Sequence, residues 1–176
     1  VPTPDNDTTP DYTFFSTLSG TINYSGDCSS YDNSSSADNN TITFNTLSEG
    51  PHTNCKISVT SSGNLTSDNL SVDNFTIDIT APSLAATTLV PSLTNDNTPN
   101  YTFSSNEAGT ITYGGSCSSS NTAAAADNNT ITFNTLGDAT YSNCTIKVRD
   151  NASNTSDNLT VNTFTIDTTG PVLDNV

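Results

Sequence analysis

The sequence consists of two copies of one segment. When the chain is shifted against itself by 89 residues, the two halves align from end to end without a gap. The stretch from Ala37 to Leu47 recurs unchanged from Ala126 to Leu136, and Phe75-Thr76-Ile77-Asp78 recurs at 164–167. A gap-free repeat of this kind indicates a tandem duplication, so it predicts two small domains of one fold in series. Below, the counterpart of a residue is the one 89 positions away in the other copy.

Apolar residues occupy every second position in several short stretches of each copy. In the first copy these are 12–14, 22–24, 42–44, 57–59, 70–72 and 75–77. Such alternation is typical of strands with one buried face, and the stretches between them are rich in Gly, Asn, Ser and Pro, which favour turns. About six or seven short strands per copy predict an all-β, two-sheet sandwich.

The aromatic residues divide into two groups. Phe15 and Tyr31 have serine counterparts, Ser104 and Ser120, so we expect these two side chains to be exposed. They are candidates for contact with a neighbour or a glycan, and the alternative is that they are ordinary isolated surface aromatics. The others lie at alternating strand positions and predict a core of Tyr12, Phe14, Tyr24, Phe44 and Phe75 with their counterparts.

Four cysteines fall into two equivalent pairs, Cys28 with Cys55 and Cys117 with Cys144. One pair per small domain predicts one intradomain disulfide in each copy and an oxidising, extracellular compartment. Two free buried thiols per domain are the alternative. A zinc site is disfavoured, since the sequence has no C-x-x-C and His52 is its single histidine.

The chain is strongly acidic. Its net charge is −15, with 18 acidic residues against only Lys56, Lys147 and Arg149. This charge predicts no nucleic-acid partner and no attraction to anionic membranes, because both need clustered Lys and Arg. Apolar stretches of a few residues likewise predict no membrane insertion.

A recurring set of motifs carries a resemblance to a known family. In the second copy these are N-D-N-T-P-N-Y-T-F at 95–103, G-T-I-T-Y at 109–113, I-K-V-R-D-N-A-S-N at 146–154 and F-T-I-D-T-T-G-P at 164–171. They resemble the bacterial Ig-like domain repeats of large extracellular surface proteins and adhesins. The resemblance implies two tandem immunoglobulin-like β-sandwich domains used as a stalk, spacer or filament unit at the cell surface. The first copy departs from the motif at Ser61, the counterpart of Asp150.

The expected domain boundaries are offset from the boundaries of the two sequence copies. Residues 82–89 precede the second copy and are expected to lead its first sheet, whereas Val1 aligns with Val90. We therefore expect repeat 1 at 1–80 without its leading strand, repeat 2 at 81–169, and at 170–176 the leading strand of a following domain or subunit. Its expected inter-subunit residues are Pro171, Val172, Leu173, Asp174, Asn175 and Val176.

Carboxylates cluster at the expected domain entrances and exits. Related Ig-like arrays are often stiffened by calcium at such junctions, so the resemblance implies calcium as the one candidate cofactor. The alternative is that these residues cap turns through hydrogen bonds to the backbone. The candidate ligands are Asp5, Asp7, Asp78, Asp96 and Asp167.

N-x-S/T sequons are frequent, and they are candidate glycosylation sites in an organism that modifies them. The candidate acceptors are Asn6, Asn23, Asn33, Asn39, Asn64, Asn69, Asn74, Asn100, Asn128, Asn143, Asn151, Asn154 and Asn158.

No motif indicates catalysis. His52 falls in an expected turn and has Tyr141 as its counterpart, so we predict a surface histidine rather than a general base. The leading interpretation is a structural repeat unit of an extracellular filament or cell-surface stalk, with identical subunits or neighbouring repeats as partners. The alternatives are an adhesin or carbohydrate-binding module that recognises surface glycans, and a spacer inside a secreted hydrolase.

Overall fold

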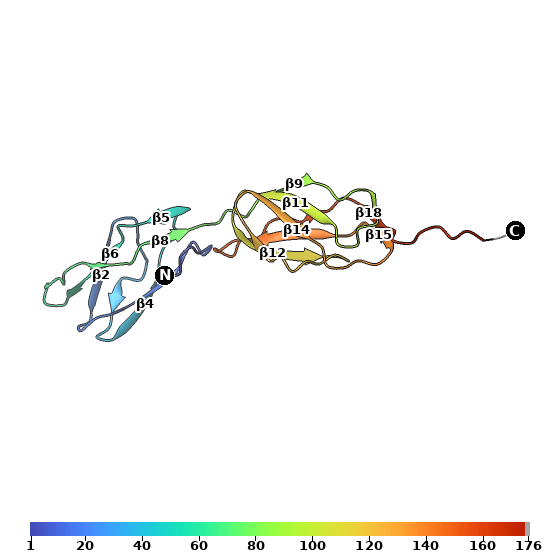
Figure 1. Cartoon of the computed structure of the whole chain (residues 1–176). Coiled ribbons are helices and arrows are strands. Elements are labelled where there is room, and N and C mark those ends of the chain that lie inside the picture. Colours follow the sequence, from blue (N-terminus) through green and yellow to red (C-terminus); the bar gives the residue numbers. More distant parts are fainter. Residues whose placement is uncertain (175–176) are drawn as a thin grey trace. The chain divides into compact units, whose positions relative to one another are not determined.

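The computed structural model describes residues 1–174, and it divides the chain into two compact units, Val1–Ile79 and Thr80–Val176. Within the described residues every regular element is a β-strand, as Figure 1 shows. The predicted all-β class is confirmed. The described part of the chain contains no helix with the length and hydropathy needed to cross a bilayer.

Unit 1 has one four-stranded sheet and two short ladders. The sheet has the order β3-β2-β6-β7, and the ladders are β1-β4 and β5-β8. The strand bounds are β1 (Asp11–Phe15), β2 (Gly20–Ser25), β3 (Ser34–Ser35), β4 (Asn39–Thr43), β5 (Gly50–His52), β6 (Lys56–Ser61), β7 (Leu70–Ser71) and β8 (Phe75–Ile77).

Unit 2 repeats this plan with two additional strands. Its four-stranded sheet has the order β13-β12-β16-β17, and the other layer contains the ladders β14-β11-β9 and β10-β18-β15. The bounds are β9 (Leu84–Thr88), β10 (Leu93–Thr94), β11 (Asn100–Ser105), β12 (Gly109–Gly114), β13 (Ala123–Ala124), β14 (Asn128–Thr132), β15 (Ala139–Tyr141), β16 (Thr145–Arg149), β17 (Leu159–Thr160) and β18 (Phe164–Ile166).

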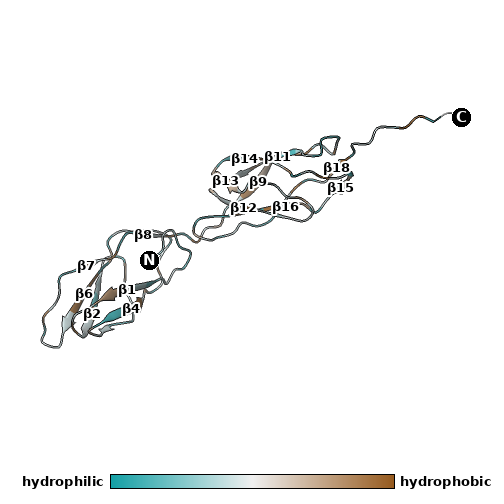
Figure 2. Cartoon of the chain, turned by 60° about the horizontal axis from the view of Figure 1, so that its bottom comes forward, coloured by the Kyte–Doolittle hydropathy of each residue, from teal (hydrophilic) through white to brown (hydrophobic). Residues whose placement is uncertain are grey.

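Each unit has its own apolar core between its two layers. In unit 1, Phe14, Phe44 and Phe75 are buried, while Tyr12 and Tyr24 are half-buried against them. Hydrophobic residues concentrate in strands such as β1, and most connecting loops are hydrophilic to neutral (Figure 2). The apolar residues that alternate along the strands therefore face the core, and the polar residues between them face solvent. Each unit is a β-sandwich.

Two strands of unit 1 were not predicted from the alternation pattern. β3 contains only Ser34 and Ser35, and β5 contains Gly50, Pro51 and His52. Both are short edge strands that owe their place to backbone pairing with a neighbour. The prediction for His52 was wrong, since its side chain is buried against Phe75, with ring centroids 5.2 Å apart.

The two predicted disulfides are present, one in each unit. Cys28 bonds to Cys55 with a Cα–Cα distance of 5.1 Å, and Cys117 bonds to Cys144 at 5.3 Å. Cys28 follows β2 and Cys55 directly precedes β6, so the bridge links the ends of two paired strands of the same sheet. It thus differs from the bridge between sheets of antibody domains.

Candidate functional site

The two units differ most at one sheet edge. In unit 2, β11 pairs with β14 on one side and with β9 on the other. In unit 1, the counterpart strand β1 pairs with β4, and no other described strand lies along its second edge. Among the described residues, that edge of β1 therefore forms no ladder with a second strand.

Strand β9 covers residues that stay open in unit 1. Val148 is fully buried and Ser156 is 4% exposed. Of their counterparts in unit 1, Val59 is half-buried and Ser67 is exposed. The local bonding is the same in both units, because each serine hydroxyl accepts a 3.0 Å hydrogen bond from the valine amide. The difference in burial thus follows from the added strand and not from a change in the turn that carries the serine.

A groove lies beside β1 where β9 would continue the sheet. Its volume is about 180 Å³, and its apolar wall comes from Phe14, Phe15, Ile57, Val59 and Leu70. Ser16, Thr17 and Ser67 complete its lining. We call this surface the β1 groove. Leu70 is 44% exposed in it, although its counterpart Leu159 is half-buried in unit 2.

The expected inter-subunit strand lies outside the sandwich of unit 2. Residues 171–174 form no strand in the described chain, and the tail runs on beyond β18 (Figure 1). Val172 is 89% exposed and Leu173 is 96% exposed. Asn175 and Val176, which were also assigned to this segment, fall outside the described residues.

Asp138 fixes the chain just before this tail. Its carboxylate accepts hydrogen bonds from the Thr168 hydroxyl at 2.7 Å, the Thr168 amide at 3.0 Å and the Thr169 hydroxyl at 2.8 Å. These hydrogen bonds, led by the one from the Thr168 hydroxyl, lower the pKa of Asp138. The tail therefore leaves unit 2 from a hydrogen-bonded anchor.

The predicted calcium ligands form turns and strand ends in both units. Asp7 accepts hydrogen bonds from the amide and hydroxyl of Thr9, and Asp96 does the same with Thr98. Asp167 accepts one from the Thr169 amide, and the Asp78 amide bonds to the Asp5 carbonyl at 2.9 Å. Asp5, Asp7, Asp96 and Asp167 belong to no group of three or more metal-ligating side chains among the described residues.

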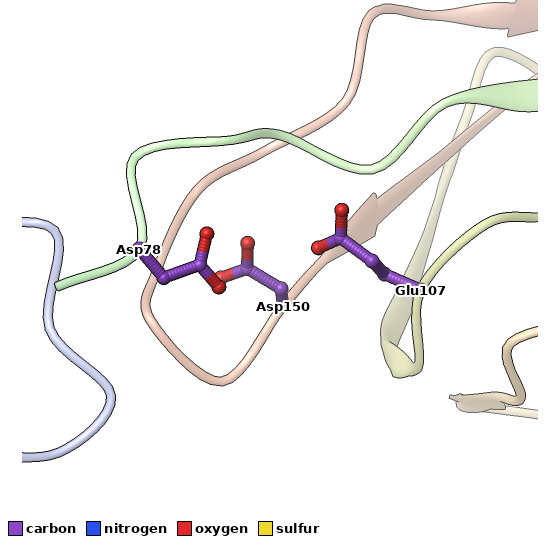
Figure 3. A group of neighbouring side chains, drawn as sticks. All are labelled: Asp78, Glu107 and Asp150. Atoms are coloured by element: carbon purple, nitrogen blue, oxygen red, sulfur yellow. The ribbon is translucent and has the colours of Figure 1, made fainter. Parts of the chain in front are cut away.

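Sequence reasoning missed an acidic pair in unit 2. Glu107 lies between β11 and β12, and Asp150 lies in the turn after β16. One carboxylate oxygen of Glu107 lies within 4.8 Å of one of Asp150. Figure 3 draws these two side chains. Asp150 also accepts hydrogen bonds from the amide and the side chain of Asn154. The V-R-D-N-A-S-N motif thus folds as a turn that is closed by hydrogen bonds between Asn154 and the carboxylate of Asp150.

The sequons lie at the surface. Twelve of the thirteen candidate asparagines are exposed, and Asn154 is half-buried. Several already use their side chains within the fold, including Asn23 with Thr60 and Asn143 with the Ser116 amide.

His52 and the two aromatic residues with serine counterparts have contrasting surroundings. His52 is 6% exposed, and its Nε2 lies 2.9 Å from the Ser48 carbonyl, so it belongs to the core. Phe15 and Tyr31 are 63% and 91% exposed. Tyr31 lines an open pocket together with Thr9, Ser30, Asp32, Thr43, Phe44, Asn45 and Thr46.

Comparison with known proteins adds little to these observations. No protein-family model and no curated protein matches the chain. A solved structure of fibronectin(III)-like modules of CbhA from Clostridium thermocellum is similar over 94% of this chain and 90% of that chain, with 11% sequence identity and a TM-score of 0.47. An identity and a TM-score this low carry no argument about function.

Proposed function

We propose that the chain is a structural repeat unit of an extracellular filament or cell-surface stalk, joined head to tail with the next copy. One observation carries this proposal: β9, in the segment that leads unit 2, pairs with the edge of β11 and completes the sheet of that sandwich. A module whose sheet is completed by the segment before it is suited to continue in series. Arrays of such modules add stability through contacts between neighbours.

The proposed location outside the cell is supported by the disulfides. Each small unit carries one bridge, and bridges of this kind persist in oxidising compartments. The net charge of −15 supports a solvated, crowded surface and disfavours nucleic acid as a partner.

The proposed role is mechanical and not catalytic. The single histidine, His52, is buried on Phe75, out of reach of a substrate.

Negative-stain imaging of native material tests this function. We expect thin fibres or stalks with a regular repeat of two small domains. Native material that contains only dispersed single chains would contradict the proposal.

Calcium binding at the acidic turns is a separate part of the proposal. The exposed carboxylates of Asp7, Asp96 and Asp167 lie near strand ends, and carboxylate oxygens are the ligands that calcium prefers. A thermal melt in EDTA, followed by added calcium, should show a higher midpoint with calcium. An unchanged midpoint would remove calcium from the proposal.

A second candidate function is recognition of surface glycans by unit 1. The observation that favours it is Tyr31, an exposed aromatic ring that lines a pocket together with Asp32 and Asn45. In unit 2 the counterpart of Tyr31 is Ser120, so this ring is specific to unit 1. Aromatic faces next to carboxylate and amide groups suit sugar rings. A glycan array probed with the wild type and with Tyr31→Ser tests it, and binding that survives the substitution would contradict it.

A further inference from the structure

We propose that unit 1 binds a sugar that carries a free amino group, in the pocket that Tyr31 lines. We call it the Tyr31 pocket, and Asp32 and Thr43 also line it. In the bound state the Tyr31 ring lies against the sugar, and the carboxylates of Asp11 and Asp32 hold the ammonium group. The inference rests on the second candidate function, glycan recognition, and it deepens that function by naming the class of sugar.

Two carboxylates meet at Thr43 in this pocket. The Thr43 hydroxyl donates a 2.6 Å hydrogen bond to Asp11, and the Thr43 amide donates one of 3.1 Å to Asp32. Both aspartate side chains are exposed. In the described part of the chain, each of these bonds occupies one carboxylate oxygen, so the other oxygen can accept a hydrogen bond from a ligand.

Unit 2 has the same backbone frame without the charges or the ring. The Thr132 hydroxyl donates a 2.7 Å hydrogen bond to Asn100, as the Thr43 hydroxyl does to Asp11. The counterparts of Asp11, Tyr31 and Asp32 are Asn100, Ser120 and Asn121. Neutral side chains therefore satisfy this frame in unit 2, and the fold does not require the two charges and the ring of unit 1.

The two charges and the ring together select a cation. Tyr31 is 91% exposed, so its aromatic face is accessible to a ligand. An aromatic face attracts an ammonium group through its quadrupole, and ionised carboxylates accept strong, charge-assisted hydrogen bonds from the same group. The net charge of −15 adds attraction for cations and repels acidic sugars.

The size and the lining of the pocket favour a sugar over a bare ammonium group. The pocket has a volume of about 570 Å³, within the range of about 300–1,000 Å³ that is typical of small-molecule sites. Thr9, Asn45 and Thr46 add hydroxyl and amide groups to its lining, and such groups exchange hydrogen bonds with sugar hydroxyls. A hexosamine with a free amine presents a ring face, hydroxyls and one ammonium group, so it matches each part of the pocket.

A matched pair of ligands tests the role of the amine. The 176-residue chain is titrated with the glucosamine disaccharide at about pH 6, where its amines are protonated, and amide shifts are followed by NMR. The N-acetylglucosamine disaccharide is the control ligand, because it has the same rings without the charge. We expect shifts at Tyr31, Asp32 and Thr43, and binding of the acetylated sugar that is weaker by at least about fivefold. Equal affinities for the two sugars would overturn the role of the amine.

Variants that install the residues of unit 2 separate the contributions. Asp11→Asn and Asp32→Asn should each weaken binding of the glucosamine disaccharide by about threefold or more and leave binding of the acetylated sugar unchanged. Tyr31→Ser should weaken binding of both sugars. Unit 2 folds with these residues at the counterpart positions, so the variants should keep the fold of unit 1. Unchanged binding in the double variant Asp11→Asn, Asp32→Asn would exclude the two carboxylates as the ammonium site.

The reverse exchange tests whether three residues are enough. Asn100→Asp, Ser120→Tyr and Asn121→Asp, combined in one chain, should create a second site and add shifts at Thr132. In the wild type the amides of unit 2 serve as the internal control and should not shift. A triple variant that gains no binding in unit 2 would contradict the assignment to these residues.

Further outcomes distinguish this inference from glycan recognition itself. Methylammonium that binds as tightly as the glucosamine disaccharide would show a simple cation site and overturn the sugar. If both sugars bind equally at Tyr31, glycan recognition stands and the selection of an amine is wrong. If neither sugar binds but the glycan array gives hits that Tyr31→Ser removes, unit 1 recognises another class of sugar. If neither sugar binds and the array is empty, both proposals fail.

Discussion

Leu84 is paired with Ser105 across the β9–β11 ladder, and its side chain packs against the core of unit 2. The counterpart of Ser105 in unit 1, Ser16, has no such strand beside it in the described chain and lines an open groove instead. The two units share a similar sequence pattern, but they therefore differ in strand pairing at this sheet edge. Several measurable differences between the units follow from this one contact.

Unit 1 should exchange its backbone amides faster than unit 2 at the open edge. β1 is paired on one side only, and Tyr12 is half-buried where its counterpart Tyr101 is fully buried. Local opening is easier where fewer apolar contacts and ladder bonds protect a strand. Hydrogen exchange read by mass spectrometry should show lower protection for β1 than for β11. Equal protection in dilute, monomeric protein would contradict the open edge.

Leu84→Ala should lower the free energy of unfolding of unit 2 by about 1–2 kcal/mol, since the half-buried side chain leaves part of the core uncovered. Leu173→Ala is the matched control. Its side chain is 96% exposed, so the substitution should leave the stability of monomeric protein unchanged. Urea unfolding of the two variants checks the pair, and a loss of stability in both would show that the tail already packs within the monomer.

The alternation of the strands was predictable, but the groove was not. Ile42 and Phe44 signal a buried strand face by themselves, because each apolar residue follows its neighbour by two positions. The wall of the groove comes from Phe14, Val59 and Leu70 on three different strands, and each is an ordinary strand residue in the sequence. Only the pairing of the strands brings them together.

The proximity of the acidic pair, Glu107 and Asp150, was also not predictable from the sequence. Glu107 and Asp150 are far apart in the sequence, and the antiparallel pairing of β12 with β16 brings their loops to one end of the sheet. The predicted ligands Asp7 and Asp96, by contrast, were recognisable as turn residues, and they bond to the backbone two positions later. Local turn chemistry is visible in a sequence, whereas contacts set by sheet pairing are visible only in the fold.

Removal of the Cys117–Cys144 bridge should destabilise unit 2 strongly. The bridge closes a loop with a sequence separation of 27 residues, for which the chain-entropy estimate is about 3–4 kcal/mol. Replacing both cysteines by alanine avoids a buried free thiol, and calorimetry should show a lower midpoint for one of the two unfolding transitions. The equivalent change at Cys28 and Cys55 is the control and should shift the other transition. A single shared shift would mean that the units unfold together.

Gly115→Ala should be poorly tolerated. Gly115 has a φ of +75°, and an added Cβ would lie 2.0 Å from the Asn143 carbonyl oxygen. A side chain there is strained and forces the backbone apart, with an expected cost of about 1–3 kcal/mol. Gly137→Ala is the matched control in the same unit, since nothing lies within 4 Å of its added Cβ. Denaturant midpoints of the two variants should differ clearly, and similar midpoints would contradict the strain at Gly115.

The anchor of the tail should respond to acid through Asp138. Its hydrogen bonds from Thr168 and Thr169 hold the pKa of Asp138 below its usual value. The ionised carboxylate therefore stabilises the anchor above the unfolded-state pKa of about 3.9, and this contribution is lost as the pH falls through the lower folded-state pKa. NMR titration should give Asp138 a pKa below the usual value of an aspartate, and Thr168→Val should raise it. At neutral pH, Asp138→Asn should loosen residues 168–169 in hydrogen exchange as acid does in the wild type. A titration of Asp138 that is indifferent to Thr168→Val would show that these hydrogen bonds do not hold the tail.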